Sequence, residues 1–218
     1  MNQKVTVIIP AFNEEKNISN IIELSKNFEF VDEILVINNL STDNTKEISI
    51  AQGATVIDCT LQGKGYAMQT GLKNAKNDII VFLDADIPDY PEDLINRLVS
   101  PILDKNADFV KASFDREGGR ITELVAKPLL KLFFPDMQKY SQPLSGMIAA
   151  KKEKFYSLDF EKDYGVDIGI LLDMAKQGAK IEEAYLGKIK NISKDWKALD
   201  KMSTDVMRAI LKRADKLS

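Results

Sequence analysis

Five large apolar residues stand in a row from Ile79 to Leu83, and two carboxylates, Asp84 and Asp86, follow directly. A run of this length is too short for a buried helix and is typical of a strand buried on both faces of a parallel sheet. Open parallel sheets bind ligands beyond the carboxyl ends of their strands. Carboxylate oxygens there suit a hard divalent cation shared with substrate phosphates. The alternative is that both aspartates only cap a helix or begin a turn.

Composition excludes several kinds of chemistry. The chain has 218 residues, a net charge of −3 and no histidine. This length favours one domain over two, and the charge gives no reason to expect nucleic-acid binding. The absence of histidine excludes Ser-His-Asp and Cys-His catalysis as well as histidine metal ligands. Catalysis must therefore use carboxylates, lysine, arginine, hydroxyls, amides and a metal.

The sequence also favours a cytoplasmic protein. The single cysteine, Cys59, cannot form an internal disulfide and is expected to be a small core residue. The apolar run at residues 5–10 is too short for a signal peptide, and no stretch is long enough to cross a bilayer. The oligomeric state is left open, with a homodimer among the options.

Short apolar runs alternate with helical spacing along the chain. Strands are predicted at residues 5–10, 33–38, 54–57, 78–83, 108–114, 146–150 and, at a sheet edge, 180–186. Helices are predicted at residues 13–26, 41–50, 66–75, from 91, and at 121–133, 164–176 and 195–217. The alternation predicts an α/β fold with a mostly parallel central sheet and helices on both faces. We expect the apolar stripe of the last helix to pack within the molecule.

Polar loops follow three of the predicted strands. Asn13 and Glu14 stand after the first strand, where they can bond a nucleotide, or Asn13 can simply cap a helix. Asn39 ends the second strand, and a Gly-Lys-Gly loop carries Lys64, which could neutralise a phosphate charge. Each loop alone is explained by capping. Together with Asp84 they predict a ligand site at one edge of the sheet.

These motifs resemble, in order and spacing, the nucleotide-binding half of A-type glycosyltransferases. The resemblance implies a Rossmann-like A-type glycosyltransferase fold in a single domain. Residues 1–115 would form the nucleotide-sugar-binding half, and residues 116–218 the acceptor-binding half with a C-terminal helix. Motifs at residues 116–125, 142–146 and 164–169 are also similar to the glucosyl-3-phosphoglycerate synthases of glycosyltransferase family 81.

The resemblance assigns roles to individual residues. It implies a donor site formed by Pro10, Ala11, Asn13, Glu14, Asn39, Lys64, Asp84, Ala85, Asp86, Tyr164 and Asp167. It implies an acceptor site formed by Gly119, Arg120, Thr122 and Ser193. It implies catalytic roles for Asp86, Leu144 and Asp167. From the residues alone, Arg120 suits bidentate binding of a small anion or a salt bridge on a surface hairpin, and Asp167 is equally a helix-start carboxylate.

The chain departs from that family at its metal site. The family carries an Arg-x-His element after a Leu-Gly pair, whereas here Ile189 and Asn191 stand at those positions. An asparagine carbonyl oxygen can bind a hard cation. We therefore expect Mg²⁺ or Mn²⁺ held mainly by Asp86 and the nucleotide diphosphate, with Asn191 as a weak or water-bridged ligand. Ser193 replaces an asparagine on the acceptor side.

The expected partners are a nucleotide sugar and a small phosphorylated acceptor. The expected reaction moves a hexose, glucose, from UDP-glucose to an acceptor such as 3-phosphoglycerate. The resembled family retains anomeric configuration, which implies a front-face reaction in which the leaving phosphate assists deprotonation of the acceptor. Two alternatives stand beside it: an inverting family 2 transferase using polyprenyl phosphate at a membrane surface, and a non-catalytic nucleotide-sugar-binding module.

Overall fold

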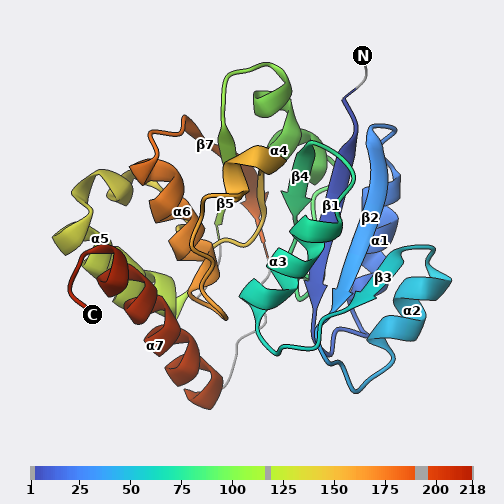
Figure 1. The fold of residues 1–218 in the computed structure, drawn as a ribbon, viewed down its shortest axis with the longest axis horizontal. Helices are drawn as coiled ribbons and strands as arrows, with labels where there is room; N and C mark the ends of the chain where they lie inside the picture. Colours follow the sequence, from blue (N-terminus) through green and yellow to red (C-terminus); the bar gives the residue numbers. More distant parts are fainter. Residues whose placement is uncertain (1–2, 116–118, 190–195, 218) are drawn as a thin grey trace.

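A computed structural model describes residues 3–115, 119–189 and 196–217 (Figure 1). Its strands form one sheet in the order β3-β2-β1-β4-β6-β5-β7. The strands are β1 (Val5–Ala11), β2 (Val31–Asn38), β3 (Thr55–Asp58), β4 (Ile79–Phe82), β5 (Phe109–Asp115), β6 (Ile148–Lys151) and β7 (Ile181–Lys188). Only the β6 pairings, with β4 and β5, are antiparallel within the described chain. The predicted mostly parallel sheet is confirmed, with β7 at its edge.

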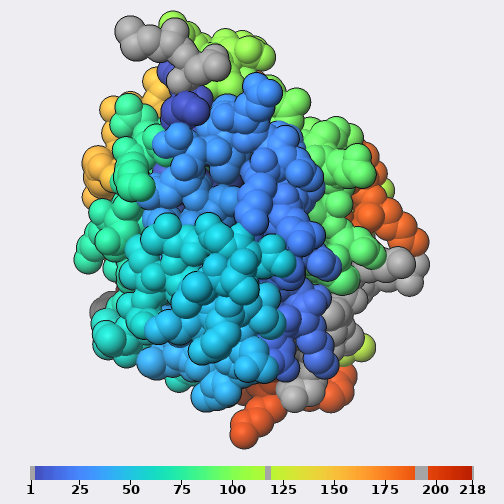
Figure 2. All heavy atoms as spheres, turned by 90° about the vertical axis from the view of Figure 1, so that its right-hand side faces the viewer, coloured from blue at the N-terminus to red at the C-terminus, as the bar shows by residue number. Residues whose placement is uncertain are grey.

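Helices cover both faces of this sheet, as predicted. They are α1 (Ile18–Lys26), α2 (Thr45–Ala51), α3 (Lys64–Asn74), α4 (Leu94–Leu103), α5 (Lys127–Phe133), α6 (Val166–Lys176) and α7 (Trp196–Arg213). The buried side chains of α1 and α4 belong to one core, and those of α3, α5, α6 and α7 belong to the other (Figure 1). Figure 2 shows the side of the molecule at α2, where the N-terminal elements form one continuous surface.

The apolar run that ends before Asp84 lies at the centre of the sheet. In β4, Ile79 and Val81 enter the α1 and α4 core, whereas Ile80 and Phe82 enter the opposite core. All four are at most 2% exposed. Each such side chain contributes about 1.5–3 kcal/mol when it is fully buried. Burial on both faces therefore explains why this strand has no polar alternation.

The strand order places a ligand crevice between β1 and β4. The chain runs from β1 outward to β2 and β3, then returns to the other side of β1 to form β4. In open parallel sheets such a reversal separates the loops at the carboxyl ends of the two central strands. Asp84 and Asp86 directly follow β4 at this point, and Ala11 ends β1.

Four helix predictions need correction. The helix predicted from residue 91 begins at Leu94, and the one predicted to residue 217 ends at Arg213. The helix predicted from Asn13 begins at Ile18, because Asn13 adopts a left-handed φ of 58° and the amides of Glu14 and Glu15 bond side chains of the α2 loop. The helix predicted at residues 121–133 contains the π-helical segment η1 (Thr122–Ala126) before α5. Pro128 has no N–H to donate to the preceding turn, which accounts for the irregularity.

The cysteine prediction is confirmed, and the predicted packing of the C-terminal helix is confirmed except at its end, where Leu217 lies beyond the helix and is exposed. Cys59 is buried and makes no disulfide. In α7, Val206, Ala209 and Ile210 are buried against α6 and its surroundings. Among the described residues, no helix combines the length and the apolar character that a membrane crossing requires.

Candidate active site

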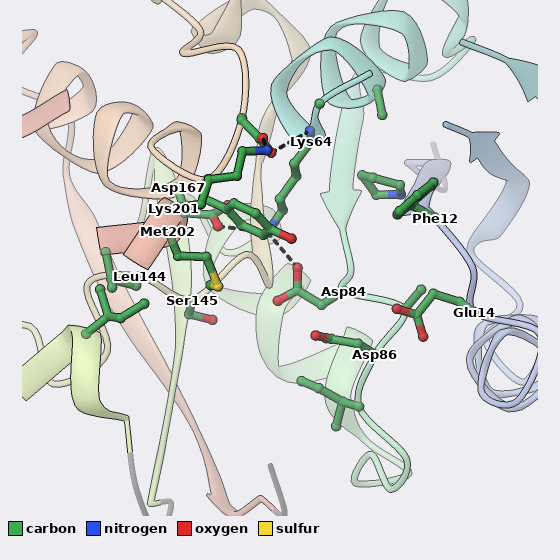
Figure 3. Close-up of a pocket in the computed structure, with 18 of the residues that line it drawn as sticks. Phe12, Glu14, Lys64, Asp84, Asp86, Leu144, Ser145, Asp167, Lys201 and Met202 are labelled. Atoms are coloured by element: carbon green, nitrogen blue, oxygen red, sulfur yellow. Dashed lines mark hydrogen bonds and ion pairs between the residues drawn. The ribbon is translucent and has the colours of Figure 1, made fainter. Parts of the chain in front are cut away.

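A cavity of about 390 Å³ opens beyond the carboxyl ends of the parallel strands (Figure 3). Most of the predicted site residues line it together: Pro10, Ala11, Glu14, Asn39, Lys64, Asp84, Ala85, Asp86, Gly119, Arg120, Thr122, Leu144, Tyr164 and Asp167. These residues come from both halves of the sequence. Asn13 does not line the cavity, and Asn191 and Ser193 lie outside the described residues.

One ammonium joins two carboxylates in the cavity wall. Lys64 Nζ lies 2.7 Å from Asp84 Oδ1 and 2.7 Å from Asp167 Oδ2 (Figure 3). Burial tends to lower the pKa of Lys64, but the two carboxylates outweigh it and raise the pKa well above its usual value. Lys64 therefore stays charged and already has two anionic partners. A phosphate would have to join this ion pair or displace one of its carboxylates.

Asp167 belongs to the first turn of α6. Its side chain is 8% exposed, and Oδ1 has no hydrogen-bond partner among the described residues. Burial raises the pKa of Asp167, and the ammonium of Lys64 opposes that shift. A buried carboxylate oxygen with spare acceptor capacity is suited to a hydroxyl donor such as a sugar OH group.

The Gly-Lys-Gly loop places Lys64 but offers few free amides. Gly63 N–H donates to Asn39 Oδ1 at 2.8 Å, and Gly65 N–H donates to the Lys162 carbonyl at 3.0 Å. A Cβ on Gly65 would overlap the Glu161 carbonyl oxygen. The glycines therefore permit close packing against residues 161–162 and do not form a phosphate cradle.

The two predicted asparagines hold loops in place. Asn39 Nδ2 donates to the Leu61 carbonyl at 2.7 Å while its Oδ1 accepts from the Gly63 amide, so both ends of this amide are used. Asn13 Oδ1 accepts from the Thr42 amide at 2.8 Å. Asn13 thus ties the β1 loop to the β2 loop and is not the N-cap of α1.

Three of the predicted acceptor residues, Gly119, Arg120 and Thr122, line the same cavity. Gly119 has a left-handed φ of 75°, and Thr122 is buried within the π-helical segment. The guanidinium of Arg120 lies 4.9 Å from the centre of the Trp196 ring, a cation–π contact with the start of α7. Arg120 is exposed at the start of a helical segment, so the hairpin alternative for this residue is wrong.

Residues 6–160 match the family described as Glycosyl transferase family 2. The chain belongs to glycosyl transferase family 2. It is 33% identical over 240 residues to the glucosyl-3-phosphoglycerate synthase of Petrotoga mobilis, covering 98% of this chain and 74% of that protein. It is 34% identical over 236 residues to the synthase of Mycobacterium tuberculosis, covering 96% of this chain and 73% of that protein.

Solved structures agree with this assignment. The crystal structure of the M. tuberculosis synthase with phosphoglyceric acid has a TM-score of 0.95 at 34% identity, covering 99% of this chain and 81% of that chain. The same enzyme with Mn²⁺, UDP-glucose and phosphoglyceric acid has a TM-score of 0.93. The predicted A-type glycosyltransferase fold is confirmed, and this family 2 protein is a glycosyltransferase.

Sequence reasoning missed several cavity residues of this glycosyltransferase. Lys201 and Met202 of α7 line the cavity, as does Phe12 of the β1 loop (Figure 3). The ammonium of Lys201 bonds Asp163 and lies 5.6 Å from the Tyr164 ring centre. Phe12 gave the one available signal, because it interrupts an otherwise polar loop. Lys201 gave no such signal, because the sequence does not show which side of α7 faces the cavity.

The acidic residues of this transferase fit a divalent cation that is shared with its substrate. The described residues contain no cluster of three or more His, Cys, Asp or Glu side chains able to hold a metal. Asp86 lines the cavity beside Asp84, whose Oδ1 already accepts from Lys64. A hard cation here needs further oxygen ligands, which a nucleotide diphosphate provides.

A substitution at Gly146 tests how tightly the cavity wall of this glycosyltransferase is packed. A Cβ at Gly146 would lie well inside 3.0 Å of both Asp84 Oδ1 and Lys64 Nζ. We expect Gly146→Ala to lower kcat about 100-fold by displacing the ion pair. Gly178→Ala is the control, because Gly178 has a φ of 72° and no neighbour within 4 Å. It should lose about 1 kcal/mol of stability and keep kcat. Wild-type turnover in Gly146→Ala would show that the pair tolerates displacement.

Proposed function

We propose that this glycosyltransferase transfers glucose from UDP-glucose to 3-phosphoglycerate in the presence of Mg²⁺ or Mn²⁺. One observation carries the proposal: donor-type and acceptor-type residues from the two halves of the chain line a single cavity. Relatives that are 33–34% identical over nearly the whole chain are glucosyl-3-phosphoglycerate synthases. Solved complexes of one such synthase contain Mn²⁺ or Mg²⁺ together with UDP.

The donor occupies the side of the cavity at β1 and β4. Pro10, Ala11 and Glu14 face the nucleoside, and Asp84 and Asp86 face the ribose and the diphosphate. Asp86 would hold a divalent cation, and a nucleotide diphosphate would supply the further oxygen ligands that such a cation needs. When bound, that cation supplies charge stabilisation to the departing diphosphate.

The acceptor occupies the side of the cavity at Arg120. Its guanidinium binds the phosphate or carboxylate of the acceptor bidentately, and Gly119 and Thr122 add amide and hydroxyl donors. The spare oxygen of Asp167 accepts a hydrogen bond from a glucose hydroxyl. Leu144 closes the cavity near the reacting centre and excludes water.

The reaction retains the anomeric configuration. The acceptor hydroxyl attacks the anomeric carbon as the bond to the diphosphate breaks, and the hydroxyl proton passes to the leaving phosphate oxygen. In this reaction Asp167 does not act as a base: Lys64 holds its Oδ2, and its Oδ1 accepts the glucose hydroxyl. NMR analysis of the product anomer tests this: an inverted product would contradict retention and assign the base role to Asp167.

Two measurements test the substrates. UDP with Mn²⁺ at 100 times its Kd should stabilise the fold by about 2.7 kcal/mol and raise the melting temperature by about 5–10 °C. Labelled UDP-glucose should then transfer its label to 3-phosphoglycerate as a water-soluble product. Label extracted into organic solvent with polyprenyl phosphate would instead support the membrane-surface alternative. No thermal shift with any nucleotide sugar would contradict the donor assignment.

A further inference from the structure

A fully buried lysine lies beneath the cavity. Lys111 belongs to β5 and is 0% exposed. Its ammonium donates to the Ser145 carbonyl at 2.5 Å. Burial lowers the pKa of Lys111 to about 8, although the nearby carboxylate of Asp167 opposes the shift. At neutral pH this buried group is therefore still mostly an ammonium.

A cation in this position is not explained by stability. Removing an ammonium from water costs several kcal/mol, and apolar replacements of buried charges are often neutral or stabilising. Lys111 nevertheless stands in a strand whose other members from Phe109 to Phe114 are buried, and most of them are apolar. The groups around the ammonium include the carboxylates of Asp167, Asp84 and Glu183 and the Ser145 carbonyl, to which it donates.

The role of this ammonium is indicated by the segment to which Lys111 is bonded. Residues 141–146, here called the wall loop, form the cavity wall that carries Leu144 and Ser145 (Figure 3). Within the described part of the chain, four hydrogen bonds anchor the wall loop to β5 and β7. Lys111 donates to the Ser145 carbonyl, and Gln142 Nε2 donates to the Phe114 carbonyl at 2.9 Å. The Ser141 amide and hydroxyl donate to Glu183 Oε1 at 2.9 and 3.1 Å.

The last residue of the wall loop, Gly146, packs against the ion pair of Asp84 and Lys64. Gly146 leaves no room for a Cβ beside Asp84 and Lys64, so the backbone there packs directly on their ion pair. A shift of the Ser145 carbonyl would move this backbone relative to the pair. Displacements of about 1 Å can lower turnover by two orders of magnitude even when the altered residue does not touch substrate.

We propose that Lys111 is a positioning residue whose ammonium holds the wall loop against the Asp84–Lys64 ion pair. The inference rests on the transfer reaction proposed above and deepens it. Lys111 does not line the cavity. It acts through the Ser145 carbonyl, which fixes where the wall loop meets the reacting groups.

The test compares Lys111→Met with a matched control. Lys152 also donates its ammonium to a backbone carbonyl, that of Ala75 at 2.7 Å, at the other end of β4. We expect Lys111→Met to lower kcat about 100-fold and to leave the KM for UDP-glucose within about threefold. Lys152→Met should keep the kcat of the wild type. Lys111→Gln should recover part of the lost kcat, because its amide can still donate to the carbonyl.

Several results would overturn the inference. These are wild-type kcat in Lys111→Met, loss of the UDP-induced melting shift in that variant, or failure of both Lys111 variants to fold. If the wild type itself transfers no sugar, the proposed function fails separately. The inference is then decided by crystal structures of the wild type and Lys111→Met: a Ser145 carbonyl displaced by about 1 Å supports it, and an unmoved one overturns it.

Discussion

Replacing Asp86 with asparagine is expected to lower kcat about 10³-fold, because the chain has few other groups to hold a divalent cation. There is no histidine in the sequence. The described residues contain no three-member acidic or sulfur cluster, and Asp84 shares one oxygen with Lys64. The proposed function therefore assigns most of the protein's charge toward the cation to Asp86.

The measurement is kcat as a function of Mn²⁺ concentration at saturating UDP-glucose. Asp86→Asn should also need a higher Mn²⁺ concentration for half-maximal rate, which separates a metal defect from a general loss of folding. Glu92→Gln is the control, since Glu92 is an exposed carboxylate near this segment that does not line the cavity. Metal-dependent turnover close to the wild-type rate would show that Asp86 is not the principal ligand.

Removing the ammonium of Lys64 should produce the largest loss of stability. Lys64→Met leaves Asp84 and Asp167 in the cavity wall without their shared cation, and their side chains are only 21% and 8% exposed. Breaking a buried pair in this way costs about 3–5 kcal/mol, because a charge is left uncompensated. For a chain of this size the melting temperature should fall by about 10 °C.

Two further variants, together with the pH dependence of stability, identify the cause of that loss. Lys46→Met removes an exposed ion pair with Asp58 and should cost at most about 1 kcal/mol. The double variant Lys64→Met with Asp167→Asn should recover part of the stability, since it removes the more deeply buried of the two stranded charges while Asp84 stays charged. A wild-type melting temperature in Lys64→Met would show that the pair contributes nothing.

The pH dependence has a definite sign. Burial already raises the pKa of Asp167 above 3.8, and loss of Lys64 should raise it further. When the pKa of a carboxyl group is higher in the folded state than in the unfolded state, the folded protein loses stability as the pH rises from the unfolded to the folded pKa. The deficit of Lys64→Met should therefore be constant above that window and shrink as the pH falls through it, whereas a packing defect would not change with pH.

The sequence predicted the sheet well because each strand is marked by a short run of neighbouring residues in the sequence. The apolar run of β4 is buried on both faces, and its end at Asp84 follows directly from the change to polar residues. The start of α1 was misplaced because a contact from a distant loop decides it: the Glu14 amide bonds Thr45 Oγ1, across 31 positions of sequence.

The sequence predicted which residues line the cavity better than it predicted what each of them bonds. The carboxyl ends of parallel strands meet at one edge, so residues after β1, β2 and β4 had to converge. The hydrogen-bond partners of Asn39 and Lys64 depend on packing between segments far apart in sequence, which periodicity does not encode. Lys111 left only a weak signal, a single lysine inside an apolar strand.

The ion pair of Lys64 with Asp167 spans 103 positions of sequence. During synthesis, the N-terminal half of the chain emerges long before α6 exists. Until α6 docks, the ammonium of Lys64 lacks one of its two anions, and the cavity lacks the wall that α6 contributes. The two-carboxylate ion pair of Lys64, and the part of the cavity wall that carries Asp167, can therefore form only after α6 has been synthesised and has packed on the sheet.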